Sequence, residues 1–210
     1  MAIEHAHIVE SDPSADLPSR PRPPEPAPRL FTVDEYYKMA EVGILRPDER
    51  VQLIEGTIFE MPAIGPRHAY NVNRLAMFFA LRLGGRAMIR NQIPIHLATR
   101  AEPEPDVAVV RTYPDNPKLY ETRHPSAEET YFVVEVADST LTFDLGAKAL
   151  MYALHGIRDL WVIDLQDDAV VVHREPTADG YASVVTMHRG DTVSPLDFPG
   201  LTFTVDELLG

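Results

Sequence analysis

Two carboxylates stand beside apolar runs that a folded chain would bury. Asp106 ends the proline-stiffened segment EPEPD and leads directly into the apolar run 107–110. Glu135 lies inside TYFVVEVAD, residues 130–138, a pattern typical of a strand buried on both faces. Removing an ionised carboxylate from water is costly unless a cation compensates its charge. Glu135 is therefore expected to face a cleft, to pair with a cation or to bind a metal.

The segment that follows predicts a helix carrying three further polar groups. Asp144, Lys148 and Tyr152 are spaced i, i+4 and i+8, which places them along one helical face. The same periodicity predicts a neighbouring core-facing side formed by Ala147, Leu150, Met151 and Leu154.

Two carboxylates on adjacent strands suit a hard divalent cation, because magnesium prefers oxygen ligands and keeps several waters. A nearby lysine would stabilise negative charge, and together these groups fit metal-assisted phosphodiester hydrolysis. An ordinary structure explains the same residues equally well. Glu135 could form an ion pair with Lys148, Asp106 could be a turn residue, and the helix face could be solvated.

The amino-acid composition limits the classes of protein to which the chain could belong. The chain has 210 residues, of which 45% are hydrophobic, which is enough for one good core. It has no cysteine, so disulfides and zinc–thiolate sites are excluded, and a reducing compartment such as the cytoplasm fits. The N-terminus lacks the pattern of a secretory signal, and no apolar run approaches the roughly 18 residues of a membrane helix. We therefore expect a soluble intracellular protein.

Charge is unevenly distributed along the chain. The net charge of −13 argues against binding nucleic acid through bulk positive charge. Between Glu60 and Glu102, however, there is no acidic residue, and this stretch carries six arginines. These arginines could contact phosphates or could simply solvate a helix. The candidates for phosphate contact are Arg67, Arg74 and Arg90.

Two regions are expected along the chain. Residues 1–29 hold seven of the nineteen prolines and predict a disordered, polyproline-like tail. Residues 30–210 predict a single domain. Its elements are a helix capped by Thr32 and Glu35, a hairpin turning at Glu55 and Gly56, a helix over 67–83, and strands around 87–98, 106–110, 130–138, 159–165, 169–175 and 181–189. Strands before and after helices predict a mixed α/β sheet flanked by helices.

The segments EPEPDVAVV, YFVVEVADST and DLGAKALMYALHGIRDLWVIDL together resemble the Uma-two family of restriction endonucleases, within the PD-(D/E)XK nuclease superfamily. The resemblance covers about residues 30–210, and its most specific part runs from Pro103 to Asp164. It implies a restriction-endonuclease-like α/β core with the site on the central sheet.

The resemblance also implies roles for individual residues. It makes Asp106 and Glu135 the catalytic metal carboxylates. The superfamily lysine usually lies two residues after the second acid, where this chain has Ala137. Lys148 on the following helix takes that catalytic role, and Tyr152 matches a recurrent supporting tyrosine.

Four further positions match the family pattern less completely. The family usually reads Glu-Leu-Ile-Asp-Gly where this chain has Gln52-Leu53-Ile54-Glu55-Gly56, so an expected third carboxylate is replaced by the weaker ligand Gln52. Glu55 is either a supporting acid or only the turn residue. His68 could contact phosphate or a metal-bound water, or cap its own helix. Gln92 could border the site.

The leading expectation is a magnesium- or manganese-dependent endonuclease that cleaves DNA. A nucleic-acid-binding module that retains the fold with weak or no catalysis is the alternative. A structural subunit whose acids form ordinary ion pairs is a third. By analogy with nucleases of the superfamily, a homodimer is possible.

Overall fold

The computed structural model describes residues 27–210, and residues 1–26, most of the expected proline-rich tail, lie outside it. The centre is a six-stranded mixed sheet in the order β3-β4-β5-β6-β7-β8. Only β5 and β6 are parallel, and every other neighbouring pair is antiparallel. The elements are α1 Val33–Glu41, β1 Val51–Ile54, β2 Thr57–Glu60, α2 Pro66–Leu83, β3 Met88–Arg90, β4 Val107–Val110, β5 Thr130–Ala137, α3 Leu141–Phe143, a π turn Asp144–Lys148, α4 Ala149–Leu154, β6 Asp159–Asp164, β7 Ala169–Thr177, β8 Gly180–His188, β9 Thr192–Val193, β10 Phe203–Thr204 and α5 Val205–Leu209.

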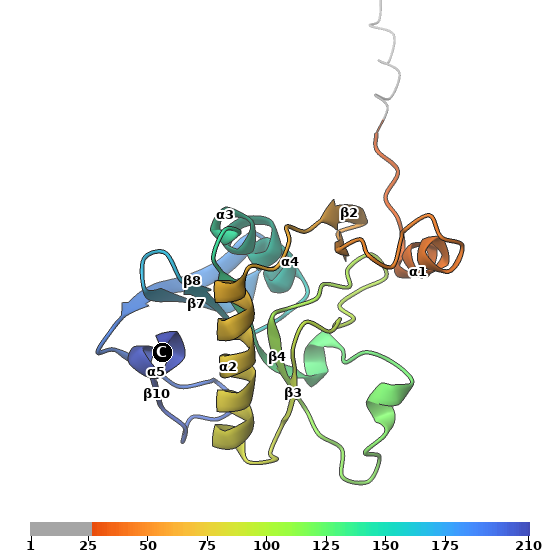
Figure 1. Cartoon of the computed structure of the whole chain (residues 1–210). Coiled ribbons are helices and arrows are strands. Elements are labelled where there is room, and N and C mark those ends of the chain that lie inside the picture. Colours follow the sequence, from red (N-terminus) through yellow and green to blue (C-terminus); the bar gives the residue numbers. More distant parts are fainter. Residues whose placement is uncertain (1–26) are drawn as a thin grey trace, which may run out of the picture.

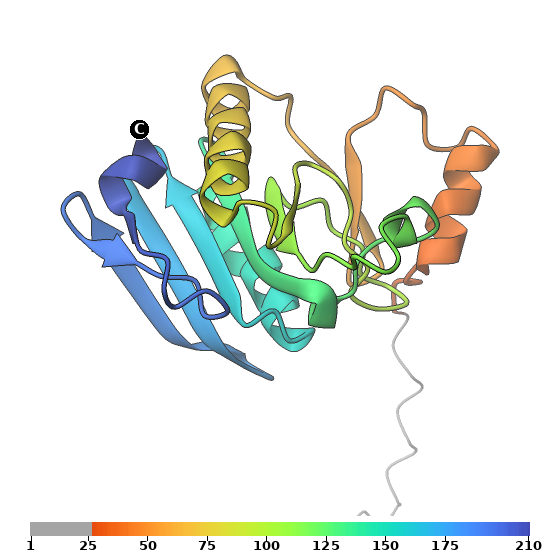
Figure 2. The same ribbon diagram turned by 90° about the horizontal axis from the view of Figure 1, so that it is seen from below.

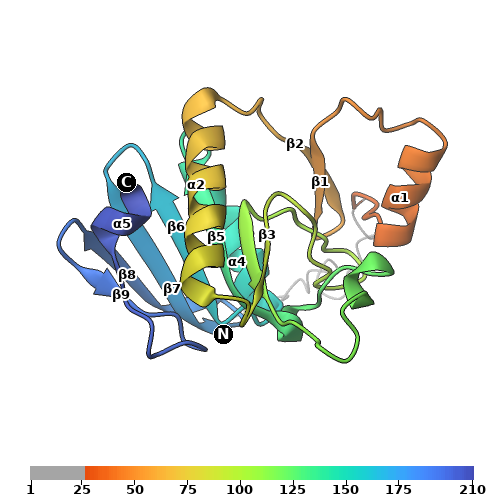
Figure 3. The ribbon, with the colours of Figure 1, turned by 60° about the horizontal axis from the view of Figure 1, so that its bottom comes forward.

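Helices cover both faces of the sheet, which confirms the predicted mixed α/β class (Figures 1 and 3). Helices α2 and α5 pack on one face, where Phe79, Phe132 and Trp161 centre a fully buried core. The segment from α3 to α4 packs on the other face, against alternate residues of the same strands. Because both layers exclude water, the sequences of the middle strands are nearly continuous apolar runs.

Local sequence signals near the N-terminus produce the predicted elements. The hydroxyl of Thr32 accepts a hydrogen bond from the Glu35 backbone, and the Glu35 carboxylate accepts one from the Thr32 backbone. This reciprocal capping box satisfies donors that the first turn leaves free. The β1–β2 hairpin turns at Glu55 and Gly56, both with positive φ, as a two-residue turn of this kind requires. Figure 2 shows α1 and this hairpin beside the main sheet.

The helix after β5 departs from the predicted pattern. It contains a π turn over Asp144–Lys148, which inserts a wider turn between α3 and α4. The expected core side is wrong at three of its four positions. Met151 is buried, whereas Ala147, Leu150 and Leu154 are exposed. The polar side with Lys148 and Tyr152 is buried against the sheet instead.

The strand predicted around 87–98 is shorter than expected. β3 ends at Arg90, and Gln92 adopts a positive φ of 53°. β3 is an edge strand of the main sheet, which fits the proline at position 94 in the same segment. In residues 27–210, no helix is long and apolar enough to cross a membrane.

Candidate active site

The register of β4 and β5 brings the two carboxylates together. Val107 pairs with Val134 in antiparallel alignment, so Asp106 and Glu135 become neighbours. The backbone N–H of Asp106 donates to Glu135 Oε2 at 3.3 Å. The backbone N–H of Val136 donates in turn to Asp106 Oδ2 at 2.8 Å. Each acid therefore lies against the other's strand, and both side chains are held in fixed positions.

Glu135 receives two further donors from the helix that covers it. Lys148 Nζ lies 2.9 Å and Tyr152 Oη 2.7 Å from the same oxygen, Glu135 Oε1. Asp144 lies one turn earlier, with its Oδ1 3.7 Å from Lys148 Nζ. All four side chains are buried, which confirms that the spacing 144, 148 and 152 places these groups on one face.

His68 and Gln92 complete the surroundings of Asp106. His68 lies near the N-terminus of α2, and its Nε2 is 3.0 Å from Asp106 Oδ1. The other ring nitrogen, Nδ1, lies 2.9 Å from the Val136 carbonyl oxygen, which fixes the ring plane. The side-chain amide of Gln92 donates to Asp106 Oδ1 at 3.3 Å. His68 therefore contacts an acidic site residue from a third element and does not act as a helix cap.

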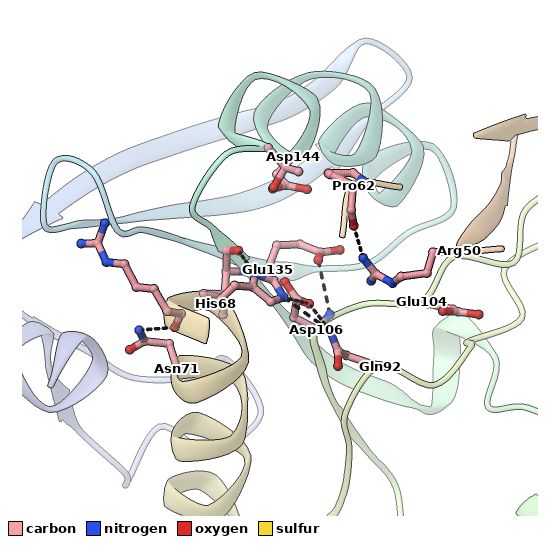
Figure 4. A network of polar contacts seen from close by, with 12 residues as sticks. Arg50, Pro62, His68, Asn71, Gln92, Glu104, Asp106, Glu135 and Asp144 are labelled. Carbon is pink, nitrogen blue, oxygen red and sulfur yellow. Dashed lines mark hydrogen bonds and ion pairs between the residues drawn. The ribbon is translucent and has the colours of Figure 1, made fainter. Parts of the chain in front are cut away.

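A pocket opens over this cluster. Figure 4 shows His68 and Gln92 turned toward Asp106, with Asp144, Arg50 and Glu104 around them. The pocket brings together polar groups that are spread along residues 50–148 of the sequence. Its polar lining includes Arg50, Gln52, His68, Gln92, Glu104, Asp106, Asp138, Thr140, Asp144 and Lys148.

The electrostatic balance of the cluster is acidic. Burial raises the pKa of Glu135 to about 7; Asp106 and Asp144 add to this shift, while Lys148 opposes it. Burial alone would lower the pKa of Lys148, but Glu135, Asp144 and Asp106 raise it overall. One ammonium thus faces three buried carboxylates, and their negative charge is only partly neutralised.

Asp106 is the strongest acid of the cluster. Burial would raise its pKa, but the hydrogen bond from His68, the charge of Lys148 and the Val136 N–H lower it overall. The same hydrogen bond raises the pKa of His68 above its ordinary value. Asp106 is therefore ionised at neutral pH, beside a histidine that readily holds a proton.

The donor set fits a hard divalent cation. Asp106 and Glu135 offer carboxylate oxygens at adjacent positions, and the excess of buried negative charge favours a bound cation. Among residues 27–210, no three His, Asp or Glu side chains are arranged to hold a metal by themselves. A cation here would rely on two carboxylates and complete its shell with water or phosphate oxygens, as magnesium commonly does.

The two early candidates occupy different environments. The side-chain amide of Gln52 lines the pocket and exchanges hydrogen bonds of 3.4 Å with the backbone of Glu104. Glu55 lies outside the pocket, at the tip of the hairpin, where its carboxylate is 2.5 Å from His155 Nε2. Of the two expected roles of Glu55, the structure shows the turn residue, and its side chain does not line the pocket.

The candidate arginines are not gathered at the pocket. Arg74 donates to the backbone carbonyls of Glu207 and Leu208, which anchors α5 against α2. Arg90 is buried and contacts His124 Nδ1 at 3.1 Å. Both guanidinium groups are therefore engaged within the fold, and neither Arg74 nor Arg90 lines the pocket. Arg67 is half exposed beside the site and pairs with Asp138 at 3.3 Å.

Sequence reasoning missed several polar residues that line the pocket, among them Arg50 and Glu104. Arg50 precedes β1 and reaches the pocket wall, where it donates to the Pro62 carbonyl. No local pattern distinguishes it from the other arginines. Glu104 lies two residues before Asp106 in an extended segment, so alternation along the backbone could have placed the two carboxylates on one side. Burial raises the pKa of Glu104.

Comparison with known proteins identifies the family and the fold of the chain. The family model for Uma2, described as "Putative restriction endonuclease", matches residues 33–206, so the chain belongs to the Uma2 family. A crystal structure described as a putative nuclease belonging to DUF820, from Anabaena variabilis, has the same fold with a TM-score of 0.63. It is 16% identical, and the alignment covers 85% of this chain and 97% of that one. No functionally curated protein matches. Family and fold together support a nuclease function.

Proposed function

We propose that this protein is a magnesium- or manganese-dependent endonuclease that hydrolyses DNA phosphodiester bonds in the cytoplasm. The observation that carries the proposal is the cluster of three buried carboxylates around one lysine, open to a polar pocket. A fold would gain little from burying this excess of charge, because each uncompensated carboxylate costs stability. The cost is explained if the site binds a divalent cation and phosphate.

In this proposal, Asp106 and Glu135 hold the cation, which would activate a water and neutralise phosphate charge. Lys148 lines the pocket while contacting Glu135, so its ammonium can stabilise charge that develops at phosphorus. Tyr152 donates to Glu135 and fixes the carboxylate in its rotamer.

His68 and Arg50 extend the proposal to proton and phosphate handling. His68 Nε2 faces Asp106 at the pocket wall, where it can hold a proton or pass it to the leaving oxygen. Arg50 supplies a guanidinium on the wall formed by the hairpin, suited to a phosphate of the bound strand. Arg67 could contact a more distant phosphate, since its side chain is half exposed.

Manganese titration by calorimetry tests the metal site without knowledge of the substrate. We expect the wild type to bind manganese and Asp106→Asn to lose at least about tenfold in affinity. The matched control is Glu121→Gln, an exposed acid remote from the pocket, which should bind as the wild type does. Equal binding by all three proteins would contradict the assignment of Asp106.

Cleavage tests the reaction and its substrate. Plasmid, linear duplex, single-stranded DNA and RNA are incubated with manganese, with and without chelator, and the products are separated on gels. We expect metal-dependent internal cuts in DNA, which are absent with Glu135→Gln. Cleavage of RNA alone would contradict DNA as the substrate. Cleavage that persists in Glu135→Gln would contradict the assignment of Glu135 to the active site.

The alternative function is a nucleic-acid-binding module with little catalysis. One observation favours it: Lys148 is buried and already engaged by Glu135, so the pocket presents few free cations. This alternative predicts DNA binding whose affinity falls steeply with salt, with no cleavage under any metal.

A further inference from the structure

Strand β8 forms one end of the main sheet and is left without a second neighbour. Among residues 27–210, β8 pairs only with β7. From Tyr181 to Met187 it carries no charged side chain, although 24% of the chain is charged. Natural proteins usually protect an exposed edge with lysines, prolines or a covering segment. This nine-residue strand has none of these within the described part of the chain, so its edge is suited to pairing.

An exposed apolar surface continues from β8 onto the helix beside it. Val184 is 53% exposed, and Leu150 on α4 is 43% exposed. These two residues and Leu145 line one groove, whose floor includes His173. His173 is buried, yet its Nδ1 has no hydrogen-bond partner. The groove therefore combines apolar walls with an unsatisfied polar atom, as surfaces that become covered often do.

The charges at the two ends of β8 indicate which partner strand fits this edge. Asp179 lies one residue before the strand and Arg189 one residue after it, and both are exposed. In an antiparallel pairing of two β8 strands centred on Val184, residues whose numbers sum to 368 face each other. Asp179 of each copy then faces Arg189 of the other, and the uncharged middles align. This edge is therefore self-complementary in charge as well as in hydrogen bonding.

We propose that a second copy of this chain pairs antiparallel along β8, with the two-fold axis at Val184. The axis is perpendicular to the sheet, so both α4 helices lie on one face and their exposed leucines flank the joined strands. The rest of each chain is strongly acidic, with a net charge of −13, so contact through this uncharged edge avoids much of the repulsion between copies.

Sedimentation velocity of the full chain, over a range of concentrations, tests the proposal. We expect a concentration-dependent dimer for the wild type and a monomer for Val184→Lys, which places two ammonium groups at the axis. Leu81→Lys is the matched control, because Leu81 is 75% exposed on α2, away from β8. Circular dichroism checks that all three proteins are folded.

A charge exchange tests the register. Asp179→Arg alone and Arg189→Asp alone each place like charges opposite one another twice per dimer, and should weaken dimerisation on the order of tenfold. The double exchange should restore it. Arg189 also contacts Asp206 at 3.1 Å, so the double variant reports on pairing only if its melting temperature stays near that of the wild type. If melting falls, the register is tested with Asp179→Arg alone, which leaves the contact between Arg189 and Asp206 in place.

Each result bears on the proposal. A wild-type monomer at all concentrations would overturn it, as would a dimer that both Val184→Lys and Leu81→Lys leave intact. A dimer lost in Val184→Lys but unaffected by either single charge change would overturn the register at Val184. None of these readouts depends on nuclease activity.

Discussion

Two buried carboxylates on neighbouring strands illustrate how a site differs from a structural ion pair. Glu135 on β5 and Asp159 on β6 are 1% and 0% exposed. Asp159 accepts hydrogen bonds from Arg174, from the Trp161 indole at 2.8 Å and from the Leu196 backbone at 2.9 Å. Its charge is matched by one guanidinium, and the pocket over the active site does not reach it.

Glu135 has donors of similar number, but its neighbourhood carries more negative charge than positive. Asp106 and Asp144 both raise its pKa, and Lys148 opposes this shift, while the His68 ring contacts Asp106. Burial of a carboxylate therefore does not identify the site in this protein. The distinguishing features are the like charge beside Glu135 and a pocket lined by its neighbours Asp106, Asp144 and Lys148. Perturbed acids that lie beside a cleft are candidates for function. The predictions below test this contrast.

The largest expected effect is on cleavage. Lys148→Met should lower the rate of metal-dependent DNA cleavage by about 100-fold to 1,000-fold, because it removes the one ammonium at the pocket. Lys118→Met, at an exposed lysine, is the matched control. Single-turnover gel assays measure the rates, and equal rates for the two variants would remove Lys148 from the machinery.

The second-largest expected effect is on the free energy of unfolding, which should differ between variants of Asp159 and of Glu135. Asp159→Ala should lower the free energy of unfolding by about 3–5 kcal/mol, because Arg174 would remain partly buried without its partner. Glu135→Gln should change it by less than about 1.5 kcal/mol at pH 7, because relief of like-charge repulsion offsets the lost ion pair. Urea denaturation followed by Trp161 fluorescence gives both values. A larger loss in Glu135→Gln than in Asp159→Ala would reverse the contrast.

A third effect depends on pH. The folded-state pKa of Glu135, about 7, lies above its ordinary 4.5, so the folded protein binds this proton more tightly than the unfolded chain does. The resulting stability is fully present below about pH 4.5 and is lost as pH rises through 7. Glu135→Gln should therefore become more stable relative to the wild type between pH 5 and pH 8, by up to about 3 kcal/mol.

A divalent metal ion should oppose the loss of wild-type stability as the pH rises. Manganese binds the ionised carboxylate, so it should stabilise the wild type more at pH 8 than at pH 6, and Glu135→Gln much less at either pH. Denaturation at both pH values, with and without manganese, measures this. Equal stabilisation of wild type and variant would show that the cation binds elsewhere.

The smallest effect concerns positioning. Tyr152→Phe removes one donor from Glu135 and should reduce manganese affinity about tenfold, with a stability loss of about 1 kcal/mol. Tyr70→Phe is the control, since Tyr70 is exposed on α2. Calorimetry and denaturation separate the two contributions. Unchanged metal affinity would give Tyr152 a purely structural role.

The sequence by itself determined the local elements and the principal acids. Capping residues, turn residues and apolar runs act over a few neighbours, so Thr32 with Glu35, the turn at Gly56 and the buried strand around Glu135 could all be predicted. A carboxylate inside such a strand needs a partner in any fold, so the sequence predicted that Glu135 requires one before its surroundings were known.

Only the tertiary structure decided how distant side chains are used. The pairing of β4 with β5 placed Asp106 beside Glu135, and the packing of the following helix turned Lys148 and Tyr152 toward them. Arg74 and Arg90 were committed to internal contacts while Arg50 reached the pocket. A long, flexible side chain takes its partner from whatever packs nearby, and that information lies in the assembled fold, not in the local sequence.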